Sequence, residues 1–288
     1  MFEFLHSYPP SPILLSAGYI TVRWYGFFIG IATILSLFVA IQTGKRNGVS
    51  TNTIIDISFW LIVWGIIGAR SYHVLNELGF YISNPVAIFK IWRGGLAIHG
   101  ALLAGVFVLI RYAKRLTLVP QNALQNTLTL LDVFAPALLL GQAIGRIGNY
   151  FNQELFGLPS LLPWSIPISP EYRPQGFEDV SYFHPTFLYE SLWDITGFII
   201  LLVMLRAGLK SKSRSQKRGR IFASYLVIYS TGRMFTEFLR IDTTPHLLGI
   251  RLPFLVSIAL MVMGILFLGI LWKKQNRDKI RTTSKNVL

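Results

Sequence analysis

Residues 254–272 have the sequence FLVSIALMVMGILFLGILW, which contains no charged side chain. A helix of about 20 apolar residues crosses the roughly 30 Å hydrocarbon core of a bilayer, and this stretch approaches that length. Residues 25–41 and 54–69 are similarly apolar. Within lipid, a backbone can satisfy its hydrogen bonds only as a helix or a closed β-barrel. In these runs apolar and polar residues do not alternate with period two, as barrel strands require. We therefore expect membrane-spanning helices.

The composition of the whole chain agrees with a membrane protein. Of its 288 residues, 52% are hydrophobic and only 14% are charged, which is too apolar for a water-soluble domain of this length. We predict an all-α polytopic bundle that forms one membrane domain over residues 1–288. Its seven predicted spans lie near residues 19–41, 54–76, 96–113, 126–146, 185–206, 221–239 and 252–272.

The net charge of +14 could suggest a nucleic-acid partner, so the positions of the basic residues matter. Of the 27 basic residues, 18 lie at the ends of the first, third, fifth and seventh spans or in the segments that follow them. Alternating helices place these connections on one side, which the positive-inside rule makes cytoplasmic, with the N-terminus outside. No nucleic-acid partner is expected. The basic segment from Lys210 to Arg220 is expected to touch membrane lipid headgroups.

Residues 150–184 form the longest polar connection and contain five prolines, four acids and a single base, Arg173. We predict that this segment is a small outer lobe. The chain has no cysteine, which excludes a disulfide, a thiolate nucleophile and a cysteine metal site in the residues given. No dense set of histidines and acids predicts a metal, and no cofactor is expected.

Small residues four apart predict close helix packing. The pairs are Gly26 with Gly30, Gly100 with Ala104, and Gly141 with Gly145.

Charged side chains within a span or at its end call for a structural or functional explanation. Inserting each one at the centre of a membrane helix costs roughly 2.5–3.5 kcal/mol. Ten such residues occur: Arg70, His99, Asp132, Arg146, Glu154, Glu190, Asp194, Arg233, Glu237 and Arg240. For Arg70, Asp132 and Asp194 the favoured interpretation is mutual pairing that holds the bundle together.

The first candidate cluster is GQAIGRIGNYFNQELFG, residues 141–157. Arg146 and Asn149 stand three apart at a helix end, and Glu154 and Gly157 follow in the turn beyond. A cation, amides and a carboxylate are therefore expected to converge, and the glycines would let backbone approach a bound group.

The second cluster is IYSTGRMFTEFLRID, residues 228–242, in which Tyr229, Arg233 and Glu237 step by four along one helix face. Arg233 and Glu237 are predicted to form an ion pair. Because guanidinium groups bind phosphate bidentately, the arginines near this boundary suit an anionic phospholipid headgroup.

Two further residues carry alternative interpretations. His99 lies at the start of the third span, where a lone histidine is ordinarily a hydrogen-bonded core residue but could also accept a proton near neutral pH. Tyr25, in RWYG, is either an aromatic-belt residue or part of the site. His184, Tyr189 and Glu190 open the fifth span in the motif HPTFLYE, whose proline suits a helix start.

These motifs closely resemble those of the bacterial prolipoprotein diacylglyceryl transferase family. GRIGNYFNQELFG, HGALLAG, HPTFLYE and the Tyr229, Arg233, Glu237 series occur in the family's order over nearly the whole chain. The resemblance implies transfer of diacylglycerol from phosphatidylglycerol to the lipobox cysteine of a prolipoprotein signal peptide, in the first step of lipoprotein maturation. The thioether product forms as glycerol phosphate leaves, in the bacterial inner membrane.

The resemblance also assigns roles to residues. It implies catalytic His99, Arg146, Arg233, Glu154 and Tyr25, and phosphatidylglycerol-binding Arg146, Asn149, Gly157, Tyr229, Arg233 and Glu237. Family members often have histidine where this chain has Arg23, so that position is left out of the site.

The chemistry of the residues agrees with this reaction. The enzyme has no cysteine, so the thiol must come from the other substrate. His99 could be its base, with Glu154 or Tyr25 as alternatives, while Arg146 and Arg233 could stabilise the departing phosphate.

Two other classes of protein fit these residues less well. A transporter could line a path with Arg233 and Glu237, but no internal repeat is evident. An intramembrane serine protease would need a serine and a histidine facing each other, and no GxSG-like motif occurs.

Overall fold

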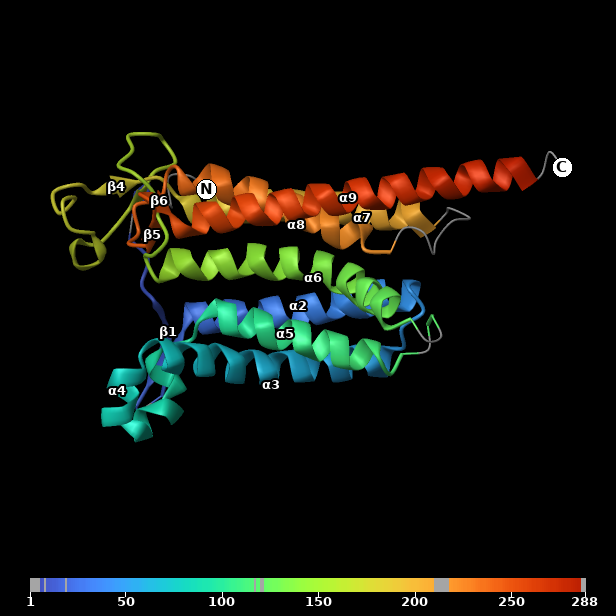
Figure 1. Ribbon diagram of the computed structural model, residues 1–288. Coiled ribbons are helices and arrows are strands. Elements are labelled where there is room, and N and C mark those ends of the chain that lie inside the picture. The colour runs from blue at the N-terminus through green and yellow to red at the C-terminus, as the bar shows by residue number, and fades with distance from the viewer. Residues whose placement is uncertain are drawn as a thin grey trace. The chain divides into compact units, whose positions relative to one another are not determined.

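The computed structural model describes residues 6–7, 9–18, 20–116, 118–119, 122–209 and 218–285. Most of the predicted basic loop from Lys210 to Arg220 lies outside this described part. Within it, the chain is largely helical, as the sequence predicts (Figure 1). Helices occupy all seven predicted places, as α2 (Trp24–Arg46), α3 (Thr51–Asn76), α5 (Ile98–Ala113), α6 (Ala123–Phe151), α7 (Thr186–Leu209), α8 (Arg220–Glu237) and α9 (Leu252–Lys285).

Five of these helices, α2, α3, α6, α7 and α9, are long and apolar enough to cross a membrane by themselves. Helix α5 has only 16 residues, and α8 carries Arg220, Arg233 and Glu237. The predicted fold class, a polytopic helical membrane protein, is confirmed. The count of seven crossings stays a prediction.

The first helix begins later than predicted. The expected span started at residue 19, but Ile20–Arg23 form strand β2, which pairs antiparallel with β1 (Ile13–Ala17). Three of the four residues of β2 are β-branched, which favours a strand over a helix. Gly18, with φ of +57°, supplies the turn between the two strands. The helix therefore starts at Trp24, after this hairpin.

The chain groups into two compact units. The first contains residues 1–39 and 134–288, and the second contains residues 40–133. Helices α2 and α6 contribute residues to both units. The single membrane domain expected over the whole chain stays a prediction.

In the second unit, α3 and α5 pack through small residues. A Cβ on Gly100 would lie 2.0 Å from the carbonyl oxygen of Gly68, and one on Gly68 would lie 2.7 Å from the Cβ of Ala104. The predicted packing role of Gly100 and Ala104 is confirmed. A Cβ on Gly26 or Gly30 would meet no atom within 4 Å, so the same prediction is wrong for that pair.

Arg70, near the end of α3, holds the segment that follows it. This segment comprises α4 (Leu78–Ser83), η1 (Pro85–Phe89) and η2 (Ile91–Arg93). The Arg70 guanidinium donates four hydrogen bonds of 2.6–2.9 Å to backbone carbonyls, those of Ala87, Ile88, Gly94 and Gly95. The expected pairing of Arg70 with another charged residue is therefore wrong, because carbonyl oxygens occupy its donors instead.

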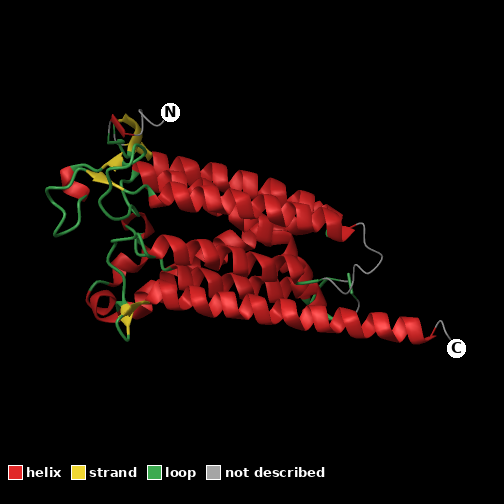
Figure 2. Cartoon of the chain, turned by 90° about the horizontal axis from the view of Figure 1, so that it is seen from above, coloured by secondary structure: helices red, strands yellow, loops and turns green. Residues whose placement is uncertain are grey.

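In the first unit, helices α7, α8 and α9 lie side by side (Figure 1). The short strands of this unit gather at one end of its helices (Figure 2). They include β3 (Ile166–Pro167), β4 (Tyr182–Phe183), β5 (His246–Leu247) and β6 (Ile250–Arg251).

The lobe, residues 150–184, has an apolar core of its own. Phe156, Ile166, Ile168 and Phe183 are buried together, and Tyr150 and Phe187 join them from the adjoining helices. Strands β3 and β4 pair within it. This core fixes the lobe on the last turn of α6 and the first turn of α7.

Candidate functional site

The site lies where α6 ends, α7 begins and α8 ends. The lobe connects α6 to α7, so the end of α6 lies beside the start of α7. The residues after α8 close this arrangement, because the N–H of Leu158 donates to the carbonyl of Leu239 at 2.7 Å. The lobe and the chain beyond α8 are thereby joined, and charged residues from three helices come within contact distance.

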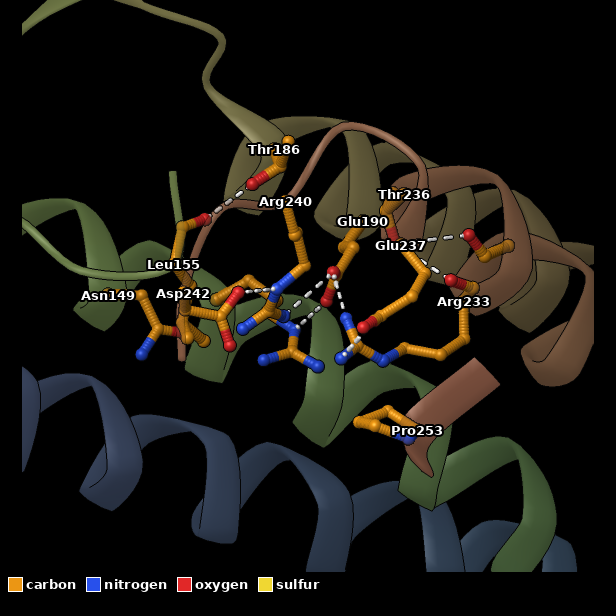
Figure 3. A network of polar contacts seen from close by, with 12 residues as sticks. Asn149, Leu155, Thr186, Glu190, Arg233, Thr236, Glu237, Arg240, Asp242 and Pro253 are labelled. Carbon is orange, nitrogen blue, oxygen red and sulfur yellow. Dashed lines mark hydrogen bonds and ion pairs between the residues drawn. The ribbon is translucent and has the colours of Figure 1, made fainter. Parts of the chain in front are cut away.

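Glu190 is the centre of the site, with its carboxylate among three arginines (Figure 3). Its oxygens lie 2.6 Å from Arg146 Nε, 3.0 Å from Arg233 Nη1 and 3.3 Å from Arg240 Nη1. The Glu190 side chain is only 6% exposed. A buried carboxylate of this kind is stable only because cations surround it.

Two further carboxylates complete the network. Glu237 lies 2.6 Å from Arg233 and 2.5 Å from Arg251. Asp242 lies 2.7 Å from Arg240 and 3.4 Å from Arg251. The predicted ion pair between Arg233 and Glu237 is confirmed, and the structure adds Arg251 on strand β6 as a second partner of Glu237.

The charges of this network do not cancel. Four arginines face three carboxylates in the ion pairs of the described residues: Arg146, Arg233, Arg240 and Arg251, against Glu190, Glu237 and Asp242. Among these ion-paired groups, the arginines exceed the carboxylates by one positive charge. An anion bound there would neutralise it, and guanidinium donors suit a phosphate.

Arg146 has the most spare hydrogen-bonding capacity among the arginines that contact Glu190. Its Nε lies 2.6 Å from Glu190, but the N–H forms no hydrogen bond because it is not directed at the carboxylate. Within the described residues the other nitrogens of Arg146 have no hydrogen bond either. Its side chain is 20% exposed, against 4% for Arg240. Of the three arginines that contact Glu190, Arg146 is therefore the best able to bind an incoming anion.

The amides of the glycine-rich motif converge on Glu154. The side-chain nitrogens of Asn149 and Asn152 donate to one oxygen of Glu154, at 2.7 and 3.1 Å. Gln153 and Leu155, on either side of Glu154, have positive φ angles, so the turn after α6 is tight. Arg146 contacts Glu190 and not Glu154, so the predicted cluster divides between two carboxylates.

Gly157 has a packing role in the structure. A Cβ there would lie 2.8 Å from the carbonyl oxygen of Leu239 and 2.8 Å from Thr186 Cγ2. Its N–H donates to the carbonyl of His184 at 2.8 Å. The residue lets the lobe approach the ends of α7 and α8, whereas the sequence had suggested an approach to a bound group.

Tyr25 and Tyr229 border the arginine network. Tyr25 packs against Gly148 of α6, where an added Cβ would lie 2.8 Å from the tyrosine ring. It lies within electrostatic reach of Glu154 and Arg146. Tyr229, on α8, is within electrostatic reach of Arg146 and Arg233. Both phenols are therefore neighbours of the predicted anion site.

His99 belongs to the other unit, so the structure describes it apart from these residues. It lies in the first turn of α5, is exposed, and its ring lies 5.6 Å from that of Tyr72 between centroids.

A second histidine, His184, lies in the lobe at the edge of the first unit. Its Nδ1 is 3.1 Å from the hydroxyl of Tyr189, which also accepts a hydrogen bond from Trp164 Nε1 at 2.9 Å. Burial lowers the pKa of the His184 imidazole, so the neutral ring is favoured near pH 7. Within the described residues no three histidines or acids gather as metal ligands do.

Part of this site was predictable from the sequence. Arg146, Arg233 and Glu237 are among the predicted site residues, whereas Glu190 and Arg240 were expected only as costly charges near the ends of spans. Arg251 and Asp242 were missed, because both follow α8 in a connection where charged residues are ordinary. The HPTFLYE motif, which contains Glu190, was the signal available for the central carboxylate.

Comparison with known proteins gives one consistent result. Residues 12–270 match the family described as prolipoprotein diacylglyceryl transferase. A relative from Trichormus variabilis, named phosphatidylglycerol–prolipoprotein diacylglyceryl transferase, is 41% identical over 264 residues, or 91% of this chain and 89% of the relative. A relative of the same name from Prochlorococcus marinus is 40% identical over 293 residues, or 94% of this chain and 93% of the relative.

The contacts of Asp242 predict a pH-dependent contribution to stability. Burial alone would raise the pKa of this carboxyl, but the hydrogen bond from Arg240 and the charges of Arg240 and Arg251 outweigh it and lower the pKa below 3.8. Asp242 therefore stabilises the fold above the unfolded-state pKa, and this stability is lost as the pH falls through the folded-state value.

We expect Asp242→Asn to lower the melting temperature of the detergent-purified protein at pH 7. The difference from wild type should stay constant down to about pH 5 and shrink below about pH 4, because the carboxyl of the unfolded wild-type chain becomes protonated there while the folded one, whose pKa is lower, is still charged. A difference that is unchanged at pH 3 would contradict this account.

Proposed function

We propose, since this chain belongs to the prolipoprotein diacylglyceryl transferase family, that it transfers the diacylglyceryl group of phosphatidylglycerol to the cysteine thiol of a prolipoprotein. The chain is accordingly a transferase of lipoprotein biosynthesis. Its partners are phosphatidylglycerol, within the membrane lipids, and a signal peptide whose lipobox contains the reacting cysteine.

The reaction balances with the groups available. The thiol of the peptide loses its proton to a base, and the thiolate sulfur attacks the glyceryl carbon that is bonded to the phosphate oxygen. A carbon–sulfur bond forms as the carbon–oxygen bond breaks, and the electron pair leaves with glycerol phosphate. The protein must therefore supply a base and a group of cations that stabilises the phosphate.

The observation that carries this proposal is the arginine network around Glu190. It places four guanidinium groups at one end of α8 with one positive charge in excess. Cations that are already positioned where negative charge develops lower the energy of the transition state. We infer that Arg146 and Arg233 bind the phosphate, while Arg240 and Arg251 keep Glu190 and Glu237 neutralised.

The direct test is an assay with purified protein, phosphatidylglycerol and a lipobox peptide. We expect the mass of the peptide to increase by one diacylglyceryl group on its cysteine. Alkylating the peptide cysteine beforehand should abolish the reaction, whereas treating the enzyme with the same reagent should not, because its chain contains no cysteine. Modification of a peptide whose cysteine is blocked would refute the proposal.

A transporter is the alternative function for which the structure offers a relevant feature, the charged pair Arg233 and Glu237. Arg233 and Glu237 do lie inside the first unit, but both are ion-paired within a closed network. A pair that is fixed by further ion pairs, in a network with one more arginine than carboxylates, supports an anion-binding site more than a conducting path.

The role of the two phosphate-binding arginines can be tested by lysine substitution. Arg146→Lys and Arg233→Lys retain the charge but lose the bidentate geometry of guanidinium. Because hydrogen bonds to charged groups contribute about 1.5–3 kcal/mol, we expect kcat/KM to fall roughly tenfold to hundredfold. The quantity of folded protein should stay near that of wild type.

Arg173→Lys is the matched control for these variants. Arg173 lies in the lobe, and its guanidinium binds the backbone carbonyls of Ile168 and Glu178 at 2.9 and 2.7 Å. Its lysine variant should keep the wild-type rate. Full activity of both Arg146→Lys and Arg233→Lys, or a loss explained by the quantity of folded protein alone, would refute their role.

His99 is proposed as the base that takes the thiol proton. Imidazole is suited to this task near neutral pH, and a cysteine thiol has a pKa of about 8.5. Tyr25 and Glu154, which lie near each other in the first unit, and His184 in the lobe are the alternatives.

If His99 is the base, His99→Gln should bind phosphatidylglycerol normally but transfer it slowly. Its activity should recover in part as the pH rises toward 8.5, because the thiol then ionises unaided. The measurement is a pH profile of kcat for both proteins. A loss that is equal at every pH would assign His99 to substrate positioning and leave the alternatives as candidates.

We further propose that the chain lies in the bacterial plasma membrane with its N-terminus and lobe outside and its C-terminus in the cytoplasm. The distribution of basic residues supports this orientation.

For the orientation, we expect a cysteine at Gln175, in the lobe, to react with a membrane-impermeant thiol reagent added outside cells. A cysteine at Ser213, which lies outside the described residues, should react only after the cells are opened. The chain has no native cysteine to interfere. The reverse labelling pattern would overturn the orientation and the proposed side of the reaction.

A further inference from the structure

Asp194 is a buried acid to which the proposed reaction gives no role. It lies on α7 one helical turn after Glu190 and is 4% exposed. Among the described residues it has no ion pair within 4.0 Å and no hydrogen bond. The mutual pairing expected for it from the sequence is therefore wrong, and its burial in a membrane-spanning helix needs another reason.

The surroundings of Asp194 connect it with the arginine network. Arg146 and Glu190 lie within electrostatic reach of its carboxyl group. Asp194 in turn lies within reach of Tyr225 and Tyr229 on α8. Asp194 therefore lies near residues of α6 and α8, on the face of α7 that also carries Glu190.

A second acceptor without a partner lies at the same level. Gln142 is one helical turn before Arg146 on α6, and its Nε2 donates to the Tyr225 hydroxyl at 3.3 Å. The Oε1 of Gln142 is buried and accepts no hydrogen bond. An acceptor left unpaired in an apolar interior is costly, so a buried acceptor of this kind needs an explanation.

Asp194 and Gln142 thus form a layer that lies one helical turn, or about 5.4 Å, farther from the lobe than the arginines. The arginines are called the upper layer, and Asp194 and Gln142 the lower layer. The upper layer consists of donors with excess positive charge, and the lower layer offers acceptor oxygens. A ligand that matches both layers has an anionic group at one end and hydroxyl donors at the other. The headgroup of phosphatidylglycerol has this pattern, because its terminal glycerol carries two free hydroxyl groups beyond the phosphate.

We infer that Asp194, assisted by Gln142, binds the free hydroxyl groups of the glycerol headgroup and so selects phosphatidylglycerol among phospholipids. This inference rests on the proposed function for the identity of the lipid. It assigns phosphate recognition to the arginines and polyol recognition to the acceptor layer. A headgroup that lacks hydroxyls would leave the acceptors unpaired, and sites built to pair with a hydroxyl reject ligands that lack one.

The first experiment measures binding without the reaction. Calorimetry on the full-length protein in detergent compares sn-glycerol 1-phosphate with n-propyl phosphate, which has the same charge but no hydroxyls. Wild type should bind glycerol phosphate about tenfold or more tightly, the effect of one hydrogen bond to a charged group. In Asp194→Ala the two affinities should become equal, with that for propyl phosphate within about twofold of wild type.

Two more variants separate recognition from folding. Asp194→Asn keeps the shape and one acceptor oxygen, so its preference should be intermediate. Ser191→Ala is the matched control, since Ser191 is equally buried on α7 and only donates to the carbonyl of Ala143 at 2.8 Å. It should retain the full wild-type preference.

The second experiment repeats the comparison with transfer rates, using phosphatidylglycerol and phosphatidylpropanol. Asp194→Ala should lose about tenfold in kcat/KM with the first lipid and little with the second. Equal weakening of both ligands, an unchanged preference in Asp194→Ala, or a wild type without preference would each overturn the role of Asp194. If wild type shows the binding preference but makes no thioether, the proposed function fails while the polyol site stands.

Discussion

The structure of the first unit depends on one carboxylate. Glu190 contacts arginines from α6, α8 and the segment after α8, all within 3.3 Å. In an apolar interior none of these charges would be stable alone, because removing a charge from water costs several kcal/mol per ion. The helix ends are therefore held together by the ion pairs that Glu190 forms with these arginines.

The lobe and the antiparallel pair of strands β5 and β6 make this arrangement possible. The close approach at Gly157 lets residues 150–184 return α7 beside α6, and the backbone bond from Leu158 to Leu239 joins the lobe to the end of α8. Strand β6 then brings Arg251 to Glu237 and Asp242. The charged site is thus built by connections outside the spans, on helices whose apolar faces are set by the bilayer.

The protein and its substrates supply different groups to the proposed reaction. The protein holds fixed cations at one level and buried acceptors one turn below, whereas the nucleophile belongs to the peptide because the chain has no cysteine. In the mechanism proposed above, such an arrangement stabilises the charge that develops during the reaction, because the cations are already in position. The excess of a single positive charge among the ion-paired groups leaves the site able to attract an anion.

The sequence alone determined the helical membrane fold, because long apolar runs admit few other structures in lipid. It also identified the Arg233–Glu237 pair, since residues four apart on a helix must share a face. It could not reveal that Glu190 is the centre of the network, that Arg251 joins it, or that Asp194 has no ionic partner. These facts depend on contacts between residues far apart in the chain. Only tertiary packing decides which charges meet, because helical periodicity fixes the face of a side chain but not the helix it will touch.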